Sequence, residues 1–307
     1  MSATPLRGLE GSPARRRREA LIRGLFLLAA VVSVIISAAI ILSLAGEAVS
    51  FVVQVDPGQL FTDGWFPRRD QFDVPTILAG TLIVAAIGMV VAAPLGIGAA
   101  IYLAEYARPS TRRLLKPVIE VLAGIPSVVL GFFALTVISP NLIDPICPGT
   151  TPLFTFAAAG IGVGILITPL IASIAEDAMH AVPNSLREAS YGLGARKRAT
   201  SVLVVVPAAI SGIVASLIVG LSRGIGETMV VAIAAGAVGG SLFSLNPCQP
   251  GQTMTAAMTA LATGSDQVRG ASLAFPSLFF IGLLLFFMTL VLNLVSERFV
   301  RRVRQRY

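Results

Sequence analysis

Arg223 and Glu227 are the residues whose type and position most directly suggest chemistry. They lie inside a long apolar region, because residues 199–222 and 228–265 contain no charged side chain. A charge at membrane depth costs at least about 2.5–3.5 kcal/mol, so it is retained for a reason. The planar guanidinium of arginine binds phosphate or carboxylate oxygens bidentately. The segment therefore predicts a place where an anion is handled.

The spacing of these two residues leaves a second interpretation open. At i and i+4 they share one helical face and can pair with each other, and a buried pair of this kind can serve packing alone. Gly224 and Gly226 favour the functional interpretation, because residues without side chains give a ligand room to approach. A proton relay through Glu227 lacks a second titratable partner in the neighbouring apolar segments.

A second candidate is the polar insert around Arg187, Glu188, Ala189 and Gly194. Pro183 and Asn184 are typical of a helix start. The glycines at 192 and 194 predict a break with a sharp turn, after which a second helix begins near residue 196. A bent amphipathic hairpin suits a protein partner, whereas the plainer interpretation is an ordinary basic connecting loop.

The composition indicates the elements that must carry these residues. The chain has 307 residues, of which 55% are hydrophobic and 13% charged, and its mean hydropathy is +0.84. Such a chain needs the bilayer as solvent, and each crossing takes about 20 apolar residues. We therefore predict an all-α integral membrane protein with about six transmembrane helices. The six segments are roughly 24–46, 75–104, 118–139, 154–175, 203–236 and 272–296.

Charge placement predicts the orientation. Most of the 23 Lys and Arg residues fall in the two tails and in the second-to-third and fourth-to-fifth connections. Since cytoplasmic loops carry the excess of basic residues, both termini are expected in the cytoplasm, with residues 1–20 forming a disordered basic tail. Only Arg68, Arg69 and Arg269 fall outside. The net charge of +7 follows from this rule, so no nucleic-acid partner is expected.

Three further residues stand on the predicted external side. Cys147 and Cys248 lie in proline-flanked loops, where an oxidising compartment permits a disulfide, although the sequence leaves open whether the loops meet. Trp65, the only tryptophan, is expected to anchor at the headgroup level, with docking of an external partner as the alternative. Residues 254–261 are too short to span and predict a helix at the outer mouth.

No phosphate-binding loop and no metal-ligand cluster are visible in the sequence. Any nucleotide chemistry must therefore belong to another chain, and this chain is not expected to be an enzyme.

Several segments together resemble phosphate ABC-importer permeases of the PstC/PstA type. The insert at 187–194, followed by Pro207, resembles the "EAA" loop of ABC-importer permeases. Supporting stretches are Gly80-Thr81-Leu82, Ala93-Pro94-Leu95-Gly96, residues 101–106, residues 123–129 and Arg223-Gly224-Ile225-Gly226-Glu227-Thr228. The first span and the Gly-Trp-Phe-Pro loop are more similar to the PstC member. Ser190 departs from the usual alanine, and the two cysteines are not part of the family pattern.

The resemblance implies a type I importer permease of MetI-like fold, in the plasma membrane of a prokaryote. It implies a permease domain at about 21–305, with a coupling loop at about 176–203. The implied partners are a homologous second permease chain, a cytoplasmic ATPase dimer that holds ATP and Mg, and an external phosphate-binding protein. Arg223 and Glu227 would line the phosphate path, whereas Arg187, Glu188, Ala189 and Gly194 would couple to the ATPase.

Three other functions stay open. The chain could serve another oxyanion or small polar solute within the same class. An ion-coupled secondary carrier needs no ATPase but more titratable residues at membrane depth. A sensor subunit would signal through the same complex without transporting.

Overall fold

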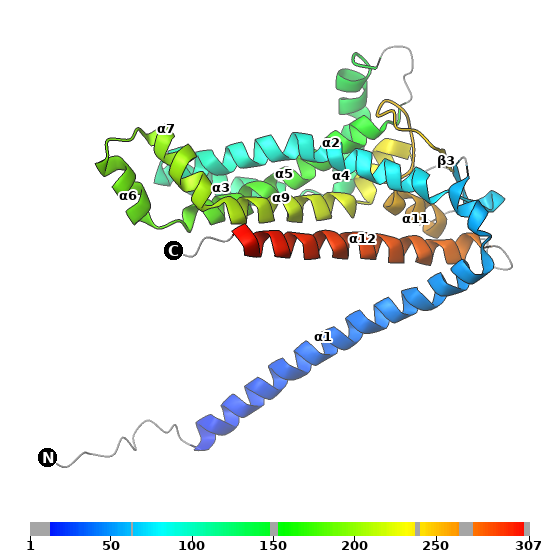
Figure 1. The fold of residues 1–307 in the computed structure, drawn as a ribbon, viewed down its shortest axis with the longest axis horizontal. Helices are drawn as coiled ribbons and strands as arrows, with labels where there is room; N and C mark the ends of the chain where they lie inside the picture. The colour runs from blue at the N-terminus through cyan, green and yellow to red at the C-terminus, as the bar shows by residue number, and fades with distance from the viewer. Residues whose placement is uncertain (1–12, 63, 148–152, 237–239, 264–272, 304–307) are drawn as a thin grey trace.

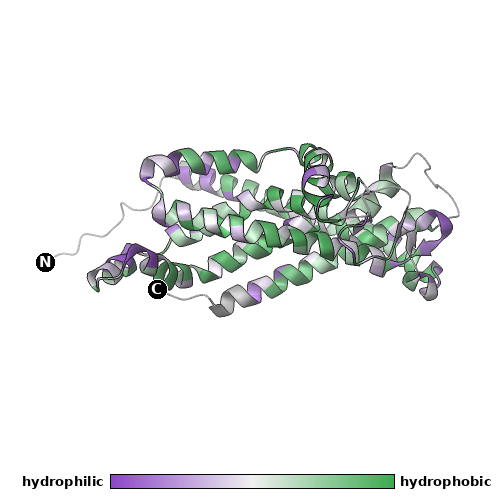
Figure 2. Ribbon diagram, turned by 90° about the horizontal axis from the view of Figure 1, so that it is seen from above, coloured by the Kyte–Doolittle hydropathy of each residue, from purple (hydrophilic) through white to green (hydrophobic). Residues whose placement is uncertain are grey.

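The computed structural model describes residues 13–62, 64–147, 153–236, 240–263 and 273–303, and most of them are helical (Figure 1). Within these ranges, four helices are long and apolar enough to cross a bilayer, and two bent helix pairs could each add one span. Polar residues gather toward the two ends of the bundle, with apolar residues between them (Figure 2). The predicted class, a helical membrane protein, is confirmed. The four unbroken helices are α1 (Pro13–Gln54), α2 (Val74–Ile101), α5 (Phe156–His180) and α12 (Ala274–Val303).

We call one end of the bundle the hairpin end, because it carries α6 (Asn184–Gly192) and α7 (Lys197–Thr200). The other is the sheet end, where β1 (Gly64–Phe66) pairs antiparallel with both β2 (Gln71–Phe72) and β3 (Ser241–Leu242). The start of α1 and the end of α12 both point toward the hairpin end (Figure 1).

Helix α1 corrects the expectation of a disordered tail up to residue 20. It begins at Pro13 and includes the arginine-rich stretch. Proline is favoured in the first turn of a helix, Arg, Glu and Ala are good helix formers, and Arg15 pairs with Glu19 one turn later at 3.1 Å. Residues 1–12 lie outside the described residues.

The third predicted segment is broken rather than merely kinked. Helix α3 (Pro109–Leu122) stops, and α4 (Ser127–Phe133) continues into the π-helical segment η4 (Ala134–Ile143) at an angle of 86° to it. Pro126 causes the break, because it disfavours the helical conformation of the residue before it.

The fifth predicted segment, 203–236, is also discontinuous and not one straight helix. α7, the π-helical η5 (Ser201–Val205) and α8 (Val206–Ala208) meet α9 (Ile210–Ile225) at 69°. After α9 the chain leaves helical geometry at Gly226–Thr228. It resumes as α10 (Met229–Val231) and the π-helical η6 (Ala232–Gly236).

Helices α2 and α5 form the centre of the bundle, and glycines set their distance. A Cβ added at Gly164 would lie 2.9 Å from the Gly88 carbonyl oxygen and from the Val91 Cβ. A Cβ added at Gly160 of α5 would come similarly close to Ile87 of α2. This glycine pair is therefore a packing device that lets the two helices approach closely.

We predict that Gly164→Ala destabilises the fold, whereas Gly98→Ala on α2 does not. A Cβ at Gly98 would meet no atom within 4 Å. Overpacking a tight helix contact costs about 1–3 kcal/mol, whereas alanine in an open helical position is intrinsically favoured over glycine by about 1 kcal/mol. Thermal unfolding in detergent checks this, and equal midpoints for both variants would contradict it.

Trp65 does not anchor in the headgroups. Its side chain is 1% exposed and packs edge-on against Phe72 with ring centroids 5.9 Å apart. It belongs to a core cluster with Phe51 and Met254. The short helix expected near 254–261 is present as α11 (Met254–Thr263), and its first four residues are buried. Two 3₁₀ turns complete this end: η1 (Pro57–Phe61) and η2 (Pro67–Arg69).

Candidate functional site

Arg223 lies in the last turn of α9 with its side chain exposed. Among the described residues, no hydrogen-bond or ion-pair partner of its guanidinium is found. The helix dipole favours a cation at a helix C-terminus, but this interaction leaves the N–H donors of the Arg223 guanidinium available. An exposed arginine deep in an apolar sequence region can therefore receive an oxyanion without first breaking a salt bridge.

Glu227 does not pair with Arg223, so the alternative interpretation of the two residues as an i,i+4 packing pair on one helical face is wrong. Helix α9 ends at Ile225, and Gly226 follows it with φ of −83°. The Glu227 carboxylate turns to the next helix instead. Its Oε1 accepts the N–H groups of Met229 at 3.2 Å and Val230 at 3.4 Å, which caps α10.

The two glycines beside Arg223 have different roles. Gly226 is exposed and leaves the backbone open, as expected. Gly224 is buried, and a Cβ there would lie 3.3 Å from a Val163 methyl group and 3.6 Å from Ile167. Gly224 therefore allows α9 to approach α5 and gives no room to a ligand.

The α6–α7 hairpin has the predicted form. Gly194 makes the turn with φ of +79°, a conformation that favours glycine. Glu188 and Ala189 are exposed on α6, and the Ser190 hydroxyl meets that of Thr200 at 2.9 Å. The sequence analysis did not single out Leu193, which is 90% exposed at the tip of the hairpin. The signal in the sequence that could have identified Leu193 is its apolar side chain within a polar loop.

Arg187 does not face outward with its neighbours on α6. It donates to the buried Glu105 carboxylate from Nε at 3.1 Å and from Nη2 at 2.8 Å. It also donates to the carbonyl oxygens of Met179 at 2.9 Å and Val182 at 2.6 Å. Its side chain is 14% exposed, so it is turned into the bundle while Glu188 and Ala189 face outward.

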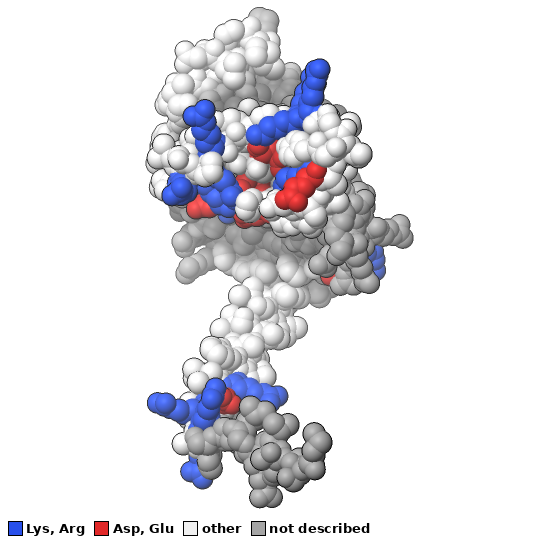
Figure 3. Space-filling view, turned by 90° about the vertical axis from the view of Figure 1, so that its left-hand side faces the viewer, with Lys and Arg blue, Asp and Glu red and all other residues white. Residues whose placement is uncertain are grey.

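A second charged cluster ties α3 to α5 at the hairpin end. Glu176 is fully buried, with Lys116 Nζ 2.7 Å and Arg112 Nη2 2.5 Å from its two oxygens. Lys116 also reaches Asp177, and Arg112 approaches His180. These basic residues look in sequence like ordinary loop charges, but they hold a helix interface. Basic and acidic side chains gather on this end of the molecule (Figure 3).

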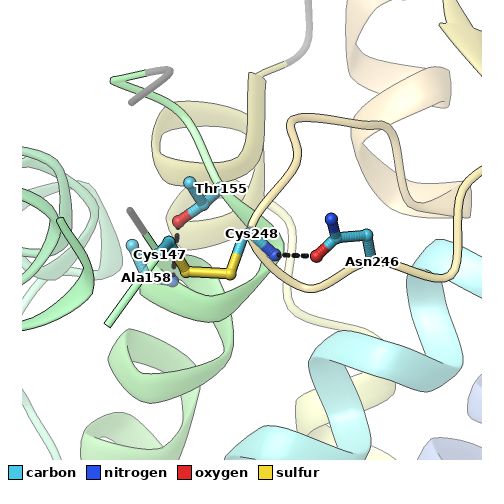
Figure 4. Close-up of a disulfide and its surroundings, with 5 residues drawn as sticks. All are labelled: Cys147, Thr155, Ala158, Asn246 and Cys248. Atoms are coloured by element: carbon cyan, nitrogen blue, oxygen red, sulfur yellow. Dashed lines mark hydrogen bonds between the residues drawn. A yellow bond between two sulfur atoms is a disulfide. The ribbon is translucent and has the colours of Figure 1, made fainter. Parts of the chain in front are cut away.

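Cys147 and Cys248 form a disulfide at the sheet end (Figure 4), with their Cα atoms 5.9 Å apart. The loop that carries Cys248 also covers the start of α5. Its Gln249 and Pro247 carbonyl oxygens accept the N–H groups of Phe156 and Ala157. These are donors that a helix N-terminus leaves free. The disulfide therefore fixes a loop that caps a central helix.

We predict that denatured, unreduced protein shows no reactive thiol, and that Cys147→Ser with Cys248→Ser lowers the unfolding midpoint. A disulfide typically stabilises by about 2–4 kcal/mol, mainly by constraining the unfolded chain. Thiol titration and thermal unfolding with and without reductant check both points. The double variant should be insensitive to reductant, and two reactive thiols in the native chain would contradict the bond.

Within the described residues, no group of three or more His, Cys, Asp or Glu side chains is placed to hold a metal ion. The candidate site combines three features: the available guanidinium of Arg223 in the bundle, the protruding α6–α7 hairpin at one end, and the disulfide-bound loop that caps α5 at the other.

Comparison with known proteins identifies the family to which this chain belongs. Residues 92–307 match the family described as "Binding-protein-dependent transport system inner membrane component". The phosphate transport system permease protein PstC of Mesorhizobium japonicum is 32% identical over 80% of this chain and 79% of its own length. PstC of Haemophilus influenzae is 32% identical over 88% and 89%.

Among solved structures, a bacterial alginate ABC transporter covers 94% of this chain and 96% of its own, with a TM-score of 0.66 at 15% identity. A chain of the MetNI methionine ABC transporter has a TM-score of 0.53 at 21% identity, over 74% of this chain and 92% of its own. These similarities confirm the expected ABC-permease fold of MetI-like type. The family match extends over more than half of the sequence, and the protein belongs to the binding-protein-dependent transport system inner membrane components.

Proposed function

We propose that this chain is the pore-forming permease subunit of an ATP-driven importer of inorganic phosphate. The observation that carries the proposal is the similarity to phosphate permeases over about four fifths of the chain. The available guanidinium of Arg223 supports it, because phosphate offers the oxygen geometry that arginine binds bidentately.

The exposed position of Arg223 also suits a path between two chains. In a single chain this side chain is open on the surface of α9, so a homologous second permease would supply the opposite wall. Burial between the two chains lowers the local dielectric and strengthens the attraction between Arg223 and an anion. Glu227 stands at the break that follows α9 and would line the same path.

The ends of the bundle would meet the other partners. The hairpin end carries most of the described basic residues, which favours the cytoplasm by the positive-inside rule. There α6 and α7 would dock on an ATPase dimer, which supplies ATP and Mg. The sheet end would face an external phosphate-binding protein. Closure of the ATPase pair would draw the hairpins together and turn the path from the inside to the outside.

Uptake of radiolabelled phosphate tests the proposal in cells that lack their own high-affinity uptake. This chain is expressed with its second permease, ATPase and binding protein. We expect ATP-dependent uptake that unlabelled phosphate suppresses and sulfate does not. Suppression by another oxyanion at lower concentration, or uptake without the ATPase subunit, would contradict the proposal. An assembled complex without uptake would also contradict it.

A further inference from the structure

Glu105 lies where α2 ends, in the π-helical segment η3 (Tyr102–Tyr106), and its side chain is 3% exposed. Two segments far away in the sequence reach it. Arg187 of α6 donates two hydrogen bonds to Oε1. The Ser201 hydroxyl of η5 lies 3.4 Å from Oε2 and shares its proton between this oxygen and the Lys197 carbonyl oxygen, which is 3.0 Å away. One carboxylate thus connects the end of α2, the hairpin and the segment that leads into α9.

Arg187 extends this connection to a third helix. Its bond to the Met179 carbonyl oxygen holds the last turn of α5, and its bond to the Val182 carbonyl oxygen holds the chain just beyond that helix. The side chain is only 14% exposed, so water competes little for these bonds. Breaking a buried, hydrogen-bonded charge pair by removing one partner is strongly unfavourable. α6 therefore cannot shift relative to α2 and α5 without carrying them along or losing this pair.

The backbone around the pair is irregular on both sides. η3 and η5 are π-helical, and the Ala107 N–H bonds the Tyr102 carbonyl oxygen five residues earlier at 2.8 Å. π-Helical turns are rare and frequently mark functional sites. Beyond them run regular helices. From η5 the chain passes through α8 and a 69° bend into α9, whose last turn carries Arg223.

We propose that Arg187, Glu105 and Ser201 form the joint that transmits movement of the α6–α7 hairpin to α2 and to the helix that carries Arg223. Arg187 is then a positioning residue inside the permease and makes no contact with the ATPase. This inference deepens the proposed function and rests on it. With the joint broken, the hairpin still follows the ATPase, but the helices no longer follow the hairpin. ATP hydrolysis then continues without transport.

The test is the amount of phosphate taken up per ATP hydrolysed by purified complexes in proteoliposomes. Arg187→Gln and Glu105→Gln each lower this ratio about tenfold or more, the range of a typical coupling between sites. The double variant is no worse than either single one, because residues that act through each other are not additive. Arg113→Gln is the control, since among the described residues this exposed side chain bonds only a carbonyl of its own helix.

Two results overturn the joint. One is a native ratio in both variants, and the other is uptake and hydrolysis that fall in parallel. If the glutamine variants fail to assemble, Arg187→Lys and Ser201→Ala are measured instead. Lysine keeps the charge but loses the forked geometry, so a reduced ratio is expected. A native ratio in both milder variants equally overturns the proposal.

A second readout needs no phosphate. Met229 is exposed just after the break that follows α9, so Met229→Cys reports opening of the path to an impermeant maleimide added outside. ATP should raise the labelling rate in the native background and not with Arg187→Gln. A complex that labels in this way but carries no phosphate would refute the proposed substrate and leave the joint standing. Unchanged ATP-dependent labelling in Arg187→Gln would refute the joint alone.

Discussion

Replacing Arg223 by glutamine lowers phosphate uptake about ten- to hundredfold at a matched amount of complex in the membrane. A hydrogen bond to a charged group contributes about 1.5–3 kcal/mol, and glutamine keeps a donor while losing the charge and the fork. The guanidinium has no partner to release among the described residues, and its loss leaves none unpaired. The fold should therefore tolerate the change, and the effect should appear in transport.

Radiolabelled uptake, with the amount of assembled complex measured in the same membranes, checks this expectation. Glu227→Gln is the informative companion, because its amide oxygen can still accept the N–H groups that Glu227 caps. If Glu227 contributes its charge to the path, this variant changes uptake as well. If it only caps α10, uptake stays native. Equal uptake by the native chain and Arg223→Gln would remove Arg223 from the path.

Much of the fold could be predicted because long apolar runs have few alternatives to a membrane helix. The breaks within the helices were harder to predict. Pro126 and Gly226 both signal a disturbed helix, but the sequence does not say whether neighbouring helices tolerate a kink or the helix ends. At Gly226 it ends, and this single difference removes the i,i+4 geometry on which the expected Arg223–Glu227 pair depended.

The burial of individual side chains was the second feature that the sequence did not predict. The partner of Arg187 is Glu105, 82 positions earlier in the chain, and nothing in the local sequence connects them. Trp65 similarly finds Phe72 and Phe51 only after the loop folds back on α1 and α2. In both cases the residue type suggested a surface role, whereas tertiary packing placed the side chain inside.

The hairpin was predicted closely, because glycine at a turn with positive φ is a local requirement that the sequence itself shows. The expectation that Arg187, Glu188, Ala189 and Gly194 couple to the ATPase did not separate the residues that face outward from the one that turns into the bundle. Arg187 and Glu188 are neighbours with opposite environments, one holding three helices together and the other exposed. Glu188, Ala189, Tyr191 and Leu193 are among the exposed residues of this hairpin.

Leu193→Ser weakens binding of the ATPase to the permease about ten- to hundredfold. Leu193 is 90% exposed in the isolated chain, and full burial of such a side chain in an interface contributes about 1.5–3 kcal/mol. The substitution leaves the permease itself intact, because the side chain contributes little to its core. Titration of purified ATPase onto permease in nanodiscs measures the effect. Leu153→Ser, the same change at an exposed position of the sheet end, should bind as the native chain does. Native affinity in Leu193→Ser would mean that the partner docks elsewhere, and an equal loss in both variants would point to damage to the fold.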